Sequence, residues 1–196
     1  SLNSIKSYIV NEEPRKATNY LNQFSKLIRL ILNASKSDRI SLKKEIETLQ
    51  NYIALEQMRS NDHFKVEFNI DMLLNLEEVA IPPMLVQPFV ENGIWHGIMH
   101  KKEEGLLKLS FEKYKDDLLK ITVSDNGIGR QASVKMNKSE PLGRKSYGIE
   151  ITKERLTSLN LPLTHLEIKD LVNKSGNIAG TEVEMIIPIL NRKSDA

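Results

Sequence analysis

The sequence contains no cysteine, which excludes a disulfide framework, thiolate metal sites and a cysteine nucleophile. It has no apolar run near the ~18 residues that a membrane-spanning helix requires, since apolar stretches such as 185–190 have only the length of a strand. It also lacks a strong charge of one sign. The formal net charge is +2, without the concentrated basic residues typical of nucleic-acid binders, so we expect no nucleic-acid partner. The 196 residues, 40% of them apolar, suit one domain with or without a helical appendage.

Two amphipathic helices are predicted in the first sixty residues, after a break at Pro14. Apolar residues recur there at steps of three and four, which is the spacing of one helix face. The two stripes comprise Tyr20, Phe24, Leu27 and Ile31, then Leu42, Ile46, Leu49 and Ile53. Asp38 or Ser41 can cap the second helix. This hairpin either packs on its own domain or also meets a second copy of the chain, and the pattern leaves both open.

An antiparallel-rich sheet with helices on one face is predicted after residue 61. Alternating apolar residues indicate strands at 64–68, 107–111, 119–123, 166–168 and 183–187, with a hairpin turn at 115–117. A helix should begin near Met84, late or distorted because of Pro88. Residues 128–147 have no clear period and predict a long functional loop, followed by a helix at 148–159. We therefore expect an α+β fold, with a hairpin domain at 1–61 and a second domain at 62–196.

Asp125 is the most informative single residue. It has the same parity as Leu119, Ile121 and Val123, so its carboxylate should point to the apolar side at the strand end. A buried carboxylate needs hydrogen-bond donors, and an adenine amine is one. Gly127 and Gly129 follow and allow a flat ligand to approach the backbone. Taken alone, however, an Asp-Asn-Gly tripeptide is more often an ordinary turn.

Polar residues in the helix after Pro83 give a second candidate group. Asn92 and His96 are four residues apart and share a face, and Glu91 and Trp95 share the neighbouring one. An Asn oxygen suits Mg²⁺, and a Glu can accept a proton from a nucleophile. In isolation, Glu91 and Asn92 are better explained as ordinary exposed polar residues or a helix cap. A lone His is more often structural, and a Trp belongs by default to a core or interface.

Two further positions complete the candidate set. Gly148 begins a predicted helix, whose free amides and dipole favour a phosphate, although a plain loop-to-helix junction explains it too. Thr181 shares parity with Val183 and Met185, so its hydroxyl should point inward near Asp125 and can help to fix an adenine. A Thr is also common in any strand.

The order and spacing of these motifs are more specific than any one of them. The chain reads Pro-Pro-Met-Leu-Val-Gln-Pro-Phe-Val-Glu-Asn at 82–92, Asp-Asn-Gly-Ile-Gly at 125–129, Ser-Tyr-Gly-Ile at 146–149 and Gly-Thr-Glu-Val at 180–183. This set resembles the N, G1, G2 and G3 boxes of the GHKL ATPases, and most closely the LytS-like sensor histidine kinases. The segments Tyr52–Arg59 and His96-Gly97 add to the resemblance, which spans nearly the whole chain.

The resemblance implies a two-layer α/β sandwich that binds ATP and Mg²⁺. It implies that Asp125 reads the adenine, that Gly127 and Gly129 seat the base, and that Asn92 binds Mg²⁺ beside the acid Glu91. The remaining implied nucleotide contacts are His96, Gly148, Ile149 and Thr181, with Lys101, Lys102, Arg144, Lys145 and Ser146 as phosphate or lid candidates. It further implies a homodimer formed through the hairpin, a response regulator as partner, and a cytoplasmic location, with any membrane segment upstream.

The chain departs from this family's pattern at three points. The phospho-accepting histidine of the family lies in a His-Phe-x-Phe-Asn segment that would precede Ser1, and His63, His96, His100 and His165 do not occupy that context. Trp95 stands where relatives often have Lys or Arg, and Ser146 stands at the first glycine of G2. Two other functions therefore remain open: a degenerate nucleotide-binding scaffold without kinase activity, and an ATPase that hydrolyses ATP.

Overall fold

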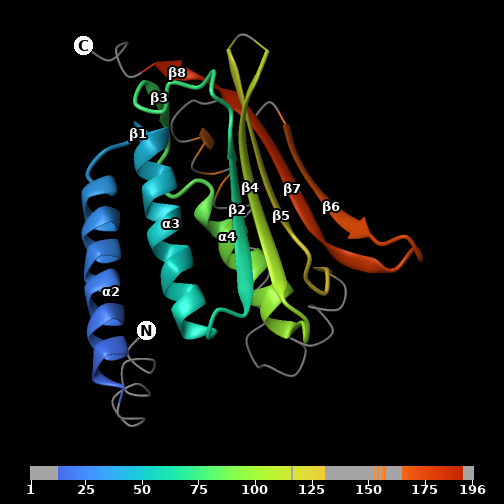
Figure 1. Ribbon diagram of the computed structural model, residues 1–196. Helices are drawn as coiled ribbons and strands as arrows, with labels where there is room; N and C mark the ends of the chain where they lie inside the picture. The colour runs from blue at the N-terminus through green and yellow to red at the C-terminus, as the bar shows by residue number, and fades with distance from the viewer. Residues whose placement is uncertain are drawn as a thin grey trace.

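The computed structural model describes residues 13–115, 117–130, 152, 154, 156, 157 and 165–191. Helices and strands alternate irregularly along the chain (Figure 1). In order, the elements are α2 (Pro14–Ala34), β1 (Ile40–Ser41), α3 (Leu42–Arg59), β2 (Phe64–Ile70), β3 (Val79–Ile81), α4 (Gln87–Asn92), the π-helical turn η1 (Gly93–Gly97), the 3-10 turn η2 (Ile98–His100), β4 (Gly105–Tyr114), β5 (Leu118–Asp125), β6 (His165–Val172), β7 (Ile178–Pro188) and β8 (Leu190–Asn191).

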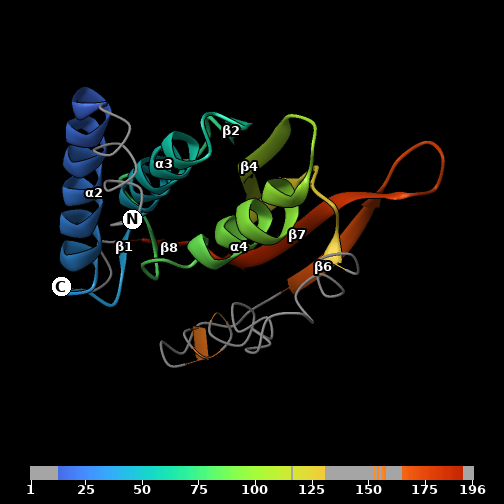
Figure 2. The ribbon, with the colours of Figure 1, turned by 90° about the horizontal axis from the view of Figure 1, so that it is seen from below.

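The main sheet has five strands in the order β2-β4-β5-β7-β6. β2 and β4 run parallel, whereas β4–β5, β5–β7 and β7–β6 are antiparallel pairs. Helices α3 and α4 lie on the same side of this sheet (Figure 2). The predicted fold class, α+β with a mixed and mostly antiparallel sheet covered by helices on one face, is therefore confirmed.

Alternation along the central strands creates the core. In β5, Leu119, Ile121, Val123 and Asp125 are all buried while the residues between them are partly exposed. β4 presents its own odd-numbered residues to the same side, because successive side chains of a strand point to opposite faces. These apolar side chains pack against the helices into one cluster, which removes their surface from water.

The two helices of the predicted hairpin have different environments. Four buried residues of α3, namely Leu42, Ile46, Leu49 and Ile53, belong to the same core cluster as the sheet. Helix α2 instead meets α3 through a smaller cluster of Ala17, Tyr20, Leu27 and Leu55. The predicted cap at Ser41 is present, since its hydroxyl accepts from Lys44 N at 3.4 Å. The division of the chain at residue 61 stays a prediction.

The segment before α4 is held by a buried carboxylate from α3. Glu45 is 1% exposed and accepts from the backbone N–H groups of Met84 (2.8 Å) and Val86 (3.1 Å). Met84 has a positive φ of 57°, and the helix begins only at Gln87, with Pro88 in its first turn. The late start predicted from Pro88 is confirmed. The π-helical turn that follows α4 was not predicted.

Other predicted elements have mixed outcomes. The β4–β5 turn is present, with Lys115 at φ 58°, and β7 is longer than expected. The predicted helix at 148–159 is described only at positions 152, 154, 156 and 157, which are helical, and most of the predicted 128–147 loop lies outside the described residues. A second sheet, β1-β3-β8, was missed. No helix within the described ranges is long and apolar enough to cross a membrane.

Candidate nucleotide-binding site

Asp125 closes β5 with its carboxylate turned into the protein. The residue is 6% exposed, and Oδ1 accepts from the backbone N–H of Gly127 at 2.8 Å. The backbone of Thr181, directly opposite on β7, provides another hydrogen bond. The inward orientation predicted from strand parity is confirmed. Because residues paired across a ladder share a face, Thr181 also lies beside Asp125 as predicted.

Burial raises the pKa of Asp125 from 3.8 to about 6. The hydrogen bonds from Gly127 and Thr181 act in the opposite direction, and the charge of Asp170 adds slightly to the rise. Desolvation thus dominates over the two backbone donors. An ionised carboxylate has lone pairs for about four hydrogen bonds, so these two donors do not exhaust its capacity as an acceptor.

Glycines allow three segments to approach one another around this carboxylate. A β-carbon on Gly97 would stand 2.6 Å from Asp125 Oδ1, and one on Gly127 would collide with the Gly97 backbone. One on Gly180 would collide with the carbonyl oxygen of Asp125. Gly129 also has φ +76°, which side-chain-bearing residues rarely adopt. The helix end, the strand end and β7 therefore meet backbone to backbone at Asp125.

Hydrogen bonds fix the loop after Asp125 in this position. Asn126 Oδ1 accepts from Leu106 N at 2.7 Å, and Asn126 N donates to Leu106 O at 3.1 Å. Ile128 N donates to Gly97 O at 3.3 Å. The loop is thus joined both to the start of β4 and to η1. A site built on such contacts is preorganised before any ligand arrives.

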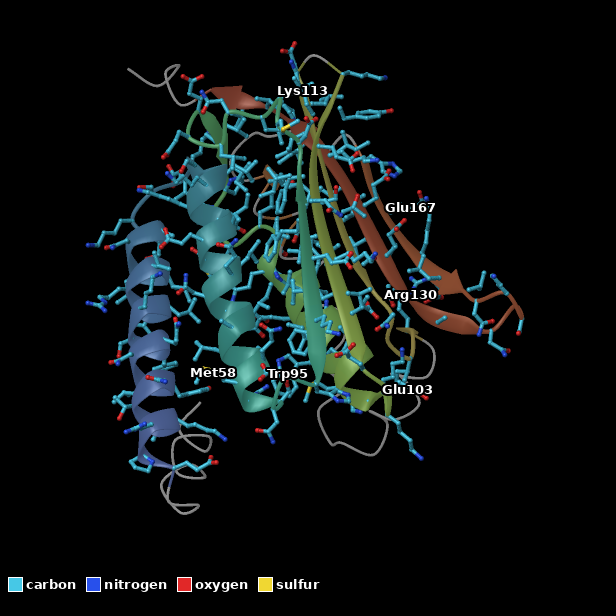
Figure 3. All side chains as sticks on the ribbon, in the orientation of Figure 1. Met58, Trp95, Glu103, Lys113, Arg130 and Glu167 are labelled. Atoms are coloured by element: carbon cyan, nitrogen blue, oxygen red, sulfur yellow. The ribbon has the colours of Figure 1, made fainter. Side chains whose placement is uncertain are left out.

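Arg130 anchors the next part of the chain to β6. Its guanidinium makes two contacts of 3.0 Å with Asp170 of the edge strand β6, and Arg130 can be followed in Figure 3. This bidentate pairing holds the pKa of Asp170 below its usual value. The contact was not predicted from the sequence, because the two residues are forty positions apart and each is an ordinary surface charge.

Glu91 and Asn92 end helix α4, directly before the η1 turn whose first and last residues, Gly93 and Gly97, both face Asp125. Glu91 Oε1 accepts from Gln87 Nε2 at 2.8 Å. Glu91, Asn92 and His96 are all partly buried. The prediction that they form one chemical site with Asp125 is consistent with their place on the α4–η1 segment, but their roles stay predictions.

Trp95 belongs to the interface with α3 (Figure 3). Its Nε1 donates to the Tyr52 hydroxyl at 3.3 Å, and the guanidinium of Arg59 lies 3.4 Å from the ring centroid. Arg59 also pairs with Glu56 at 2.6 Å. Burial raises the pKa of both Tyr52 and Glu56. The default assignment of this Trp to a core or interface is confirmed, because its ring packs against Tyr52 and Arg59 of α3.

The predicted phosphate and lid residues divide into two groups. Lys101 and Lys102 lie after η2, where Lys101 N donates to Ile98 O at 2.9 Å and Lys101 O is 3.0 Å from His63 Nε2. The other members of the set, Arg144, Lys145, Ser146, Gly148 and Ile149, lie outside the described residues. Within the described part of the chain, no group of three or more His, Cys, Asp or Glu residues is placed to hold a metal ion. Mg²⁺ keeps several waters and binds phosphates beside few protein groups, so the single side-chain oxygen of Asn92 fits this ion.

The structure adds Gly97, Gly180 and Gln87 to the predicted site residues. The two glycines had a detectable signal, since each adjoins a predicted site residue: Gly97 follows His96 and Gly180 precedes Thr181. Gln87 gave no such signal, because its contact with Glu91 becomes visible only once α4 is built.

The fold is that of histidine kinase catalytic domains. The histidine kinase domain of the blue-light activated kinase EL346 from Erythrobacter litoralis superposes with a TM-score of 0.54 at 17% identity, covering 87% of this chain and 75% of that one. The mycobacterial sensor histidine kinase MprB gives a TM-score of 0.51 at 10% identity, covering 78% and 97%. These likenesses establish the architecture.

Sequence comparison identifies the particular relatives. The chain is homologous over its whole length to LytS sensor proteins: it is 32% identical to LytS of Staphylococcus haemolyticus over 197 residues and 30% identical to the sensor histidine kinase/phosphatase LytS of Staphylococcus aureus (strain Mu50) over 194 residues. These alignments cover 100% and 96% of this chain. The family model for histidine kinases matches residues 1–64. The chain spans about a third of the length of these relatives, 32% and 31% respectively. The predicted resemblance to LytS-like sensor histidine kinases is confirmed.

Proposed function

We propose that this chain is the ATP-binding kinase region of a two-component sensor histidine kinase, which transfers the γ-phosphate of ATP to a histidine located before Ser1. The observation that carries the proposal is the buried carboxylate of Asp125, surrounded by glycines and 6% exposed. The homology to LytS kinases over the whole chain supports it.

Adenine fits the chemistry of this carboxylate. Its exocyclic amine donates a hydrogen bond, whereas guanine has a carbonyl oxygen at that position and would face the carboxylate with a second acceptor. The space next to the Gly127 Cα is filled by the Gly97 backbone and that next to the Gly129 Cα by Ile178, so these glycines let the loop pack tightly beside Asp125 and hold this carboxylate for the base. In this proposal Thr181, which is paired with Asp125 across the ladder, helps to fix the same base.

The phosphates belong toward α4 and the loop beyond it. In this proposal Asn92 contributes its side-chain oxygen to Mg²⁺, which when bound neutralises phosphate charge. His96, Lys101 and Lys102 lie on the same segment, and the proposed contacts outside the described residues are Arg144, Lys145, Ser146, Gly148 and Ile149. Glu91 accepts the proton that the attacking imidazole loses. Positioning and charge neutralisation then supply most of the rate.

We propose that the chain forms a homodimer through the helical hairpin, with α2 at the interface, and passes phosphate to a response regulator. Three large apolar side chains on α2, Leu21, Ile28 and Leu32, are 49%, 39% and 57% exposed. Their spacing of seven and four places them on one side of the helix, as in a bundle interface. A cytoplasmic location, with any membrane segment elsewhere in the protein, follows from the same proposal.

Phosphorylation of the intact protein containing this chain tests the proposed activity. With γ-labelled ATP and Mg²⁺ we expect acid-labile label on the protein, and an Asn92→Ala variant should lose it while keeping its fold. Steady release of inorganic phosphate without labelled protein would favour an ATPase. Failure to bind nucleotide at all would favour the scaffold.

A further inference from the structure

Gln87 forms a hydrogen bond with Glu91, the proposed proton acceptor. It stands in the first turn of α4, one helical turn before Glu91, and is 9% exposed. Its Nε2 donates to Glu91 Oε1 at 2.8 Å. Because a carboxylate accepts but cannot donate, the amide nitrogen must face Glu91 and the amide oxygen must face away.

The Gln87 amide oxygen gains no hydrogen bond from the described part of the chain. Gln87 Oε1 is buried, and no donor among the described residues hydrogen-bonds to it. A buried acceptor without a donor is destabilising, and an apolar side chain of the same length would avoid the loss. Gln at this position is therefore not explained by stability, whereas its contact with Glu91 has a chemical use.

Several charged or polar groups surround Glu91 on the side of α3. The pKa of Tyr52 and that of Glu56 are both raised further by the charge of Glu91, so these side chains lie within its electrostatic reach, and Arg59 pairs with Glu56. Among these groups the Glu91 carboxylate can adopt more than one orientation. A fixed donor one turn earlier on the same helix restricts it to one orientation.

We propose that Gln87 is a positioning residue for phosphotransfer, whose amide holds the Glu91 carboxylate where it accepts a proton from the incoming histidine. The inference rests on the proposed function. In the step it serves, an imidazole nitrogen attacks the γ-phosphorus and forms the P–N bond. The bond from phosphorus to the leaving oxygen of ADP breaks with its electron pair, and the ring N–H proton passes to Glu91.

The substitution Gln87→Met in the intact kinase separates positioning from structure. Met has similar length and no polar atom, so it removes both the donor to Glu91 and the unpaired oxygen. We expect the urea midpoint to stay at or above that of the unmodified protein and KM for ATP to change by less than about twofold. The value of kcat for autophosphorylation should fall by about tenfold or more. This is less than the ~100-fold or more expected when a proton acceptor is removed, because Glu91 is only displaced.

Gln57→Met is the matched control. Gln57 Nε2 donates to the backbone oxygen of Phe64 at 3.0 Å, so the same substitution there removes a purely structural hydrogen bond. We expect it to lower the urea midpoint and to leave kcat unchanged.

Each other outcome for Gln87→Met overturns the inference. A kcat equal to that of the unmodified kinase shows that Glu91 needs no such donor. A marked fall in the urea midpoint, or failure to fold, shows that Gln87 is structural. If the unmodified kinase itself transfers no phosphate to histidine, the proposed function fails first, and that result is seen before any variant is compared.

Discussion

Gly97 lies directly against Asp125, so that a β-carbon at position 97 would stand 2.6 Å from the Asp125 Oδ1 atom. The contact joins the π-helical turn after α4 to the end of β5. It places the segment that carries Glu91 and Asn92 beside the carboxylate proposed to read adenine. The geometry of the site thus depends on the absence of one side chain.

Gly97→Ala should therefore damage the site. The added methyl group must displace the carboxylate or the η1 turn, which we expect to lower the free energy of unfolding by about 1–3 kcal/mol and the affinity for an ATP analogue by about tenfold or more. Gly93→Ala is the control, because its β-carbon would meet only the end of Leu107 at 3.2 Å and Asp125 at 3.5 Å. Unfolding in urea and analogue titration measure both. Unchanged binding by Gly97→Ala would contradict the account.

Asp125→Asn should stabilise the ligand-free protein at neutral pH. The pKa of Asp125 is about 6 in the fold against 3.8 when unfolded, so the unfolded state releases its proton more readily. The native protein therefore loses stability as pH rises through the interval from about 4 to about 6, and the two-unit shift corresponds to about 3 kcal/mol. Asn does not ionise.

The difference between the two proteins gives the test. Free energies of unfolding measured from pH 3.5 to pH 8 should nearly coincide at the acid end, after allowance for the other residues. Above pH 7 the free energy of unfolding of Asp125→Asn should exceed that of the unmodified protein by up to about 3 kcal/mol. If the difference in free energy of unfolding between the two proteins does not change with pH, ionisation of Asp125 does not destabilise the fold, which would contradict this prediction.

Glu45→Ala should weaken both the fold and the start of α4. The substitution leaves the buried N–H groups of Met84 and Val86 without their acceptor, which we expect to cost about 3 kcal/mol. Glu77→Gln removes the charge from an exposed pair with Lys43 and should stay within about 0.5 kcal/mol. Urea unfolding compares the two. If Glu45→Ala lowers the free energy of unfolding as little as Glu77→Gln does, Glu45 does not hold the segment before α4.

Leu32→Glu should dissociate the proposed dimer without unfolding the protomer. Leu32 is 57% exposed on α2, so a charge is tolerated in the monomer but not in an apolar interface. Met72→Glu is the control, since Met72 is 99% exposed and lies off the helix. Sedimentation equilibrium should give a dimer for the control and a monomer for Leu32→Glu. A mass unaffected by Leu32→Glu would place the interface elsewhere.

Local periodicity was sufficient to predict the central strands and the orientation of Asp125. Alternation in β4 and β5 fixes which side chains face the core, and the carboxylate simply continues that alternation. The late start of α4 was likewise predictable from Pro88, because the physics of proline is local.

Contacts between distant segments could not be predicted in this way. The approach of Gly97 to Gly127 depends on where the π-helical turn falls, and the pairing of Trp95 with Tyr52 spans forty-three residues. The strands β1 and β8 have two residues each, too few to show any period. These features depend on packing between segments that are far apart in the chain, which local sequence patterns do not reveal.

Titration of a fluorescent ATP analogue with Mg²⁺, with competition by ATP and by GTP, tests the central claim most directly. The account predicts saturable binding that ATP displaces far better than GTP and that Asp125→Asn abolishes or weakens by about a hundredfold, the loss for removing one buried charged hydrogen bond. Binding of equal strength to the unmodified protein and to Asp125→Asn, with ATP and GTP competing alike, would contradict it.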